Sequence, residues 1–171
     1  MSIQFDPRLT LGALVQRGAA PVGFLQELPP VELTAILYLR LWCDGDMGRD
    51  QVARDFRLAL GMDDAVTALM TFDALVQGIL RGARRPLMCH GVECRCFGGD
   101  ESAFANMLAA AASGDREDAM LFAAHLMAGD AAYTVVFSAM QFGLALLRLA
   151  LLRLARAMPA PTHASPSHFT H

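Results

Sequence analysis

Short connections rich in glycine and aspartate divide this 171-residue chain into apolar segments, and they constrain its fold more than any other feature. The clearest are Asp44-Gly45-Asp46, Ser113-Gly114-Asp115 and Gly129-Asp130. Connections this short join helices that lie antiparallel and side by side. We therefore expect an all-α fold, an antiparallel helical bundle of five to six helices. Between its two halves we expect an irregular or short hairpin Cys/His loop at about 83–99.

Apolar residues recur with helical spacing in each segment between these connections. The predicted helices cover residues 30–43, 49–60, 63–80, 101–113, 115–128 and 131–157. Pro29-Pro30 suits the start of the first helix, and Asp100 is the expected N-cap of the fourth. We expect residues 1–29 to form an N-terminal arm with a short helix at about 8–17. Residues 30–158 should form a single helical domain, followed by a disordered tail at 159–171.

The last predicted helix, 131–157, is long for a small domain. At 1.5 Å per residue it would span about 40 Å. Hydrophobic residues also make up 54% of the chain, and such an excess indicates buried helices, an oligomer interface or both. We expect a homodimer formed through this C-terminal helix, and the alternative is a central core helix of the monomer. No membrane span is expected, because Gln141 interrupts the apolar run and Arg148 closes it.

The segment between the two helical halves concentrates the residues that carry chemistry. Cys89, His90, Cys94 and Cys96 include three of the four cysteines of the chain, within eight residues. The N-terminus shows no signal peptide, and all 14 basic residues are arginine, which we attribute to the codon bias of a GC-rich bacterial genome. In a reducing bacterial cytoplasm, the expected location, clustered cysteines are typical of metal ligands rather than disulfides.

The spacing of these residues indicates which of them share a metal. Cys94 and Cys96 lie on one face of an extended segment, whereas the adjacent Cys89 and His90 point to opposite faces, so that only one of these two joins them. A turn at His90-Gly91 would fold 87–90 back onto 93–96. A fourth ligand would come from His125 or Cys43. The expected cofactor is zinc, and an iron–sulfur cluster ranks below it because only three cysteines are local.

These patterns leave several functions open. The main hypothesis is a metal-binding loop with a structural or sensory, regulatory role, because no catalytic residues are identifiable. A thiol-redox or metal-dependent enzyme is an alternative, and so are inert buried thiols. Residues 49–97 are also similar to a winged helix-turn-helix regulator with a basic hairpin, in which Arg81, Arg84 and Arg85 would grip phosphates. Nucleic acid is not the favoured partner, because the net charge is −3.

Overall fold

The computed structural model describes residues 18–157 and confirms the predicted all-α bundle. In this part of the chain a short 3₁₀ turn, η1 (Leu25–Glu27), leads into six α-helices. The helices are α2 (Pro30–Cys43), α3 (Asp46–Leu60), α4 (Met62–Gly82), α5 (Gly99–Ser113), α6 (Arg116–Leu126) and α7 (Gly129–Ala157). Each observed helix contains or closely overlaps one predicted from the apolar spacing. The predicted helix at 8–17 and the tail at 159–171 lie outside the described residues.

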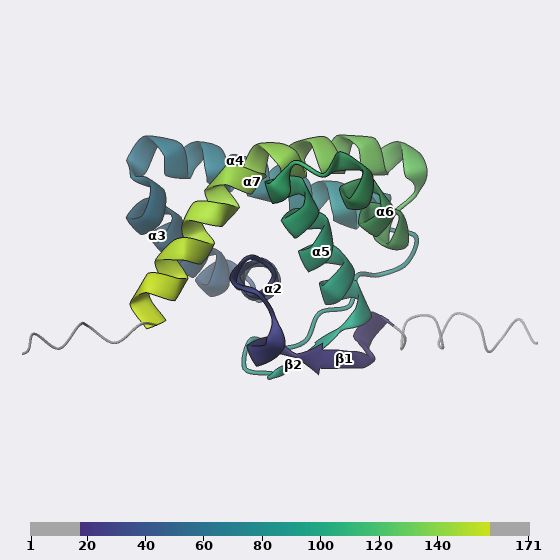
Figure 1. Cartoon of the computed structure of the whole chain (residues 1–171), viewed down its shortest axis with the longest axis horizontal. Coiled ribbons are helices and arrows are strands. Elements are labelled where there is room, and N and C mark those ends of the chain that lie inside the picture. The colour runs from purple at the N-terminus through teal and green to yellow at the C-terminus, as the bar shows by residue number, and fades with distance from the viewer. Residues whose placement is uncertain (1–17, 158–171) are drawn as a thin grey trace, which may run out of the picture.

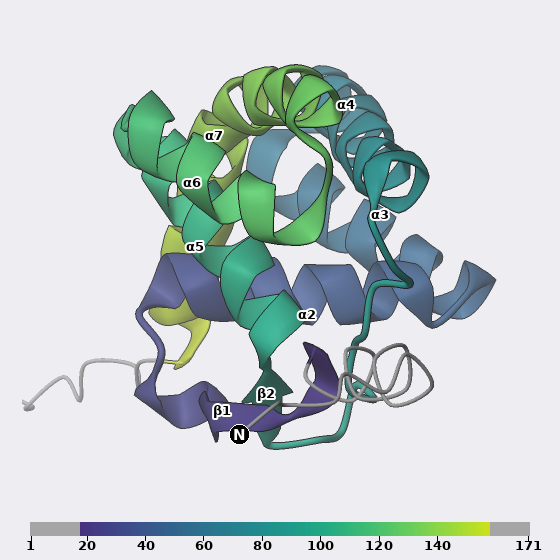
Figure 2. The same cartoon turned by 90° about the vertical axis from the view of Figure 1, so that its right-hand side faces the viewer.

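Helix α2 lies at the centre of the bundle and contacts α3, α5 and α7 (Figures 1 and 2). Its apolar residues surround the helix, as expected for an element covered on several sides. Two aromatic residues of α2 pack with three from neighbouring helices in edge-to-face, tilted and stacked contacts. The five are Tyr38, Trp42, Phe56, Phe72 and Phe142. The cluster joins α2, α3, α4 and α7 into one core. Helix α2 is therefore held firmly where it contacts the irregular segment at 84–95.

A small antiparallel sheet closes the lower side of the bundle. Strand β1 (Pro21–Phe24) pairs with β2 (Cys96–Gly98), with Gly23 opposite Phe97. Residues 87–90 do not pair with 93–96 as the strands of a hairpin, and residues 96–98 pair with β1 instead. The chain from 84 to 95 is irregular, with a tight turn in which the Cys94 N–H donates to the Gly91 carbonyl at 3.0 Å. Figure 2 shows this segment running down from α4, past α2, to β2.

The start of α5 differs from the sequence prediction. The N-cap is Gly98, and the predicted cap, Asp100, lies in the first turn of the helix. The Asp100 carboxylate is occupied by Arg85 and by the Met88 N–H. Glu101, at the third helical position, instead accepts from the Gly98 N–H at 2.8 Å. Both acidic side chains are buried, so the beginning of α5 is tied to the irregular segment before it.

Helix α7 passes over α5 and α2 and turns downwards in its C-terminal half (Figure 1). It is the one helix within residues 18–157 that is long and apolar enough to cross a membrane, with a mean hydropathy of 1.9. Nevertheless, 44% of that window is buried against the rest of the protein, which is compatible with a core helix of a soluble protein. The rest of α7 is partly half-buried and partly exposed.

Candidate metal site

Three of the predicted ligands meet in the irregular segment between α4 and α5. One ligand atom from each of His90, Cys94 and Cys96 lies within 4.8 Å of the other two. The two sulfur atoms, Cys94 Sγ and Cys96 Sγ, are 2.8 Å apart. All three residues are partly buried. The group could therefore hold a metal ion at the edge of the protein, with one side open to solvent.

The turn that carries these residues is held by Arg40, on the central helix α2. Its guanidinium is buried and donates to three backbone carbonyls of the segment, namely Gly91 at 3.2 Å, Cys94 at 2.6 Å and Cys96 at 2.7 Å. Carbonyls in an irregular segment lack the partners that a helix or sheet would supply. Arg40 supplies them from below, and so fixes the backbone on which both cysteines sit.

Glu101 neutralises Arg40 and completes the support. Arg40 Nε and Nη2 donate to its two carboxylate oxygens at 2.6 and 3.1 Å, and both side chains are inaccessible to solvent. Burial by itself raises the pKa of Glu101, but the hydrogen bonds from Arg40, the Gly98 N–H and His90 outweigh it, so that the pKa lies below its ordinary value. Glu101 is therefore a buried carboxylate that stays ionised.

The same carboxylate orients His90. It accepts from the His90 N–H at 3.0 Å and lies 2.7 Å from the ring nitrogen Nδ1. An ionised carboxylate can only accept, so Nδ1 must carry a proton. In the neutral imidazole the lone pair is then on Nε2. This is the arrangement typical of metal-ligating histidines, whose second ring nitrogen donates to a carboxylate.

Cys89 lies outside the group of three. Its thiol interacts with Cys43 at the end of α2. The alternation of side chains along an extended segment predicts that Cys89 and His90 point to opposite faces, but it does not predict this contact. Hydrogen bonding from Cys89 lowers the pKa of Cys43 to about 7, with help from the positive charge of Arg49 and against the effect of burial. Hydrogen bonding to Cys43, together with burial, raises the pKa of Cys89. The four cysteines thus form two neighbouring pairs.

His125, the candidate fourth ligand, is also placed elsewhere. It is exposed on α6 and lines a separate hollow of about 320 Å³ with Asp100 and Ser102. Cys43 lies beside Cys89. Within residues 18–157 the metal-ligand group therefore comprises His90, Cys94 and Cys96 without a fourth protein ligand.

Arg40 and Glu101 were missed in the sequence. Arg40 interrupts the apolar helix 30–43 between Leu39 and Leu41, and a charge buried on such a helix requires a partner. Glu101 stands three residues after Gly98, which is the spacing of a helix-capping glutamate. These two signals could have identified the pair, although neither indicates that the two residues meet.

The basic hairpin expected of a winged helix does not form within 83–98, because β2 pairs with β1. Arg85, one of its predicted phosphate contacts, pairs with Asp100 at 2.5 and 2.6 Å. No family model matches this chain, and neither does any curated protein or solved structure.

Proposed function

We propose that this protein binds one zinc ion through His90 Nε2, Cys94 Sγ and Cys96 Sγ, and that it serves as a metal sensor or regulator. The observation that carries the proposal is the contact between Glu101 and His90 Nδ1, 2.7 Å long, which in the neutral imidazole leaves the lone pair on Nε2, in a residue grouped with two cysteine sulfurs. A buried carboxylate holding one histidine in this tautomer is explained more economically by a metal than by packing alone.

The donor set favours zinc over other ions. Two thiolates and one imidazole suit a borderline-soft ion in tetrahedral geometry. With Zn–S bonds of about 2.3 Å, a tetrahedral site holds its sulfurs about 3.8 Å apart. The Cys94 and Cys96 sulfurs, now 2.8 Å apart, would separate by about 1 Å on binding, a change within reach of side-chain rotation. An iron–sulfur cluster usually takes four cysteines, and Cys89 and Cys43 lie outside the group.

Two features favour a sensory role over a purely structural one. Arg40 already holds the carbonyls of Gly91, Cys94 and Cys96, so the backbone of the site does not depend on the metal. Structural zinc sites are also typically closed by four protein ligands, whereas this group offers three. We therefore expect a protein that stays folded without metal, binds it reversibly, and leaves one coordination position for solvent or another donor.

Metal analysis tests the proposal. Protein loaded with zinc and then desalted should retain about one ion per chain. Cobalt(II) in its place should give thiolate-to-cobalt charge-transfer absorption. The double variant Cys94→Ser, Cys96→Ser should lose both signals. His90→Asn should weaken binding, because an asparagine amide can still donate to Glu101 but supplies no imidazole ligand.

The chain supplies its own controls. Cys43→Ser, Cys89→Ser removes the neighbouring thiol pair, and His125→Asn removes the other histidine of the helical body; both variants should bind zinc like the wild type. The proposal is wrong if the Cys94, Cys96 variant binds as much zinc as the wild type. Equal loss of zinc in the Cys43, Cys89 variant would mean that Cys43 or Cys89 is also a ligand, contrary to the proposed set of three.

The close sulfur contact supports a second candidate function, a redox-responsive thiol pair. In metal-free protein, hydrogen peroxide would take two electrons and two protons from Cys94 and Cys96, forming the disulfide and two molecules of water. Mass spectrometry of peptides should then show a Cys94–Cys96 linkage, and bound zinc should protect against it. If peroxide leaves both thiols free or forms sulfinic acids alone, the redox function is refuted and the metal proposal is unaffected.

A further inference from the structure

The outward face of α7 carries a row of large apolar side chains that nothing in the chain's described part covers. Tyr133, Phe137, Leu144 and Leu151 are each between 61% and 64% exposed. Single exposed apolar residues are ordinary on protein surfaces, but a contiguous row along one helix indicates a contact surface. We call these four residues the α7 ridge.

The ridge belongs to a regular repeat. With Met140, Leu147 and Leu154, the ridge residues follow alternating steps of four and three over three heptads. This is the spacing of the contact seam between two helices that pack with knobs in holes. The opposite side of α7 is already buried against the core, through residues such as Val135, Phe142 and Leu146. The four exposed ridge residues are therefore additional to what the monomer core needs, whereas Met140 is partly buried against that core.

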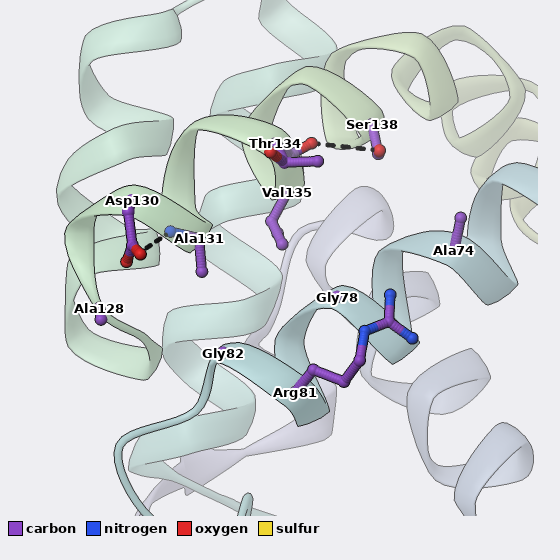
Figure 3. Close-up of a pocket in the computed structure, with 10 residues that line it drawn as sticks. All are labelled: Ala74, Gly78, Arg81, Gly82, Ala128, Asp130, Ala131, Thr134, Val135 and Ser138. Atoms are coloured by element: carbon purple, nitrogen blue, oxygen red, sulfur yellow. Dashed lines mark hydrogen bonds between the residues drawn. The ribbon is translucent and has the colours of Figure 1, made fainter.

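The crevice between α4 and α7 is lined by small residues. Near the start of α7 the crevice widens into a pocket of about 540 Å³. There Val135 points towards Gly78 of α4, and Thr134 and Ser138 line the α7 side (Figure 3). The crevice lies further round α7 than the ridge, because at about 100° per residue Thr134 and Ser138 point about 100–140° away from Tyr133. A two-fold rotation would bring the ridge of one copy onto the ridge of the other, as an isologous interface requires.

The charged residues at the two ends of α7 favour a second copy of this chain, packed antiparallel, as the partner of the ridge. Asp130 is exposed at the start of α7, and Arg156 is exposed near its end, whereas Arg148 already pairs with Asp64 of α4 at 3.2 Å. An antiparallel pair brings the acidic start of one helix to the basic end of the other and opposes the helix dipoles favourably. A parallel pair would place arginine beside arginine.

The exposed area is of the size that a specific dimer needs. Aromatic side chains bury about 150–250 Å² when fully covered, so four large side chains exposed by about three-fifths supply about 400 Å² per copy. A standard interface buries about 800 Å² per partner, of which a little over half is apolar. The ridge alone thus provides nearly the whole apolar share.

From these observations we infer that the α7 ridge is the interface of a homodimer, in which two copies of this chain pack their α7 helices antiparallel. The inference is independent of the metal proposal, because no residue of the ridge belongs to the irregular segment.

Sedimentation velocity of the full chain tests this inference. The wild type should sediment as a species of twice the 18.4 kDa chain mass and dissociate on dilution. The variant Phe137→Glu, Leu144→Glu should be monomeric, with a dissociation constant at least about thirtyfold weaker. Both positions are exposed, so circular dichroism should report unchanged helicity.

Met47→Glu is the matched control, because Met47 is 83% exposed in the first turn of α3, outside α4 and α7. It should leave the dimer unchanged. A wild type that stays monomeric at high concentration would overturn the inference, as would a dimer that survives the Phe137, Leu144 variant. Flotation of the wild type, but not of that variant, with phosphatidylcholine vesicles would assign the ridge to a membrane instead.

Discussion

The buried pair of Arg40 and Glu101 can be broken without altering the size of the core. Arg40→Met fills the same space with a long, flexible side chain that is apolar instead of charged. It removes five hydrogen bonds, two to Glu101 and three to the carbonyls of the irregular segment. The remaining Glu101 carboxylate would stay buried with donors from His90 and Gly98 alone.

The expected loss of stability is large. Removing one partner of a fully buried ion pair costs about 3–5 kcal/mol, because the other charge is left in the interior without compensation. A domain of this size has a total stability of about 5–15 kcal/mol, so Arg40→Met should lower Tm by roughly 10 °C or more. The double variant Arg40→Met, Glu101→Leu should recover at least about 1 kcal/mol of this loss, since neither charge then remains.

Urea unfolding followed by circular dichroism measures these effects and provides the double-mutant cycle. Asp64→Asn is the control, because the ion pair of Asp64 with Arg148 is solvent-exposed and should be worth less than about 1 kcal/mol. If Arg40→Met costs no more than this control, Arg40 is not desolvated in solution. The account of how the metal site is held in place would then be wrong.

Three further predictions concern single residues. Because the pKa of Glu101 is lowered on folding, its contribution to stability should be present above about pH 4.3, the pKa of an unperturbed glutamate, and be lost as the pH falls through the folded pKa, in urea titrations at several pH values; an unchanged midpoint in acid would contradict this. Cys43, with its pKa lowered to about 7, should be alkylated by iodoacetamide at a rate that rises through neutral pH. Cys89→Ala, which removes the donor, should shift that profile to higher pH; identical profiles would exclude the thiol contact. Gly82→Ala should destabilise the protein by about 1–3 kcal/mol, because a Cβ there would lie 2.6 Å from a side chain of α7, whereas Gly129→Ala, with open space around it, should be tolerated; equal Tm values would argue against the close α4–α7 contact.

The helices could be predicted from the sequence because their signals are local. Apolar spacing and the glycines at 45, 61 and 114 mark the segments and their ends, and all three glycines have positive φ. The β1–β2 pair could not be predicted, because residues 21–24 carry no indication of a partner more than 70 positions away. The turn lies two residues later than the sequence predicts, with Val92-Glu93 rather than His90-Gly91 at its centre.

In the candidate site, too, the local features could be predicted from the sequence and the long-range contacts could not. That His90 or Cys89, but not both, would join Cys94 and Cys96 followed from the alternation of an extended chain. The choice between them was set by Glu101, which lies on another element and fixes His90. A distant carboxylate of this kind leaves no periodic pattern in the sequence, so its role became visible only when the helices were packed.

The three metal ligands are close together in the sequence, but the residues that hold them in position, Arg40 and Glu101, come from distant parts of the chain. All three ligands fall within seven residues, but Arg40 and Glu101 are 61 positions apart. Bringing together residues so far apart in the chain costs loop-closure entropy, which the fold of the whole domain must offset. A peptide of residues 88–98 would contain all three ligands but neither Arg40 nor Glu101, the residues that position them. The ratio between its zinc affinity and that of the whole chain would therefore measure how much of the site's affinity comes from the tertiary fold.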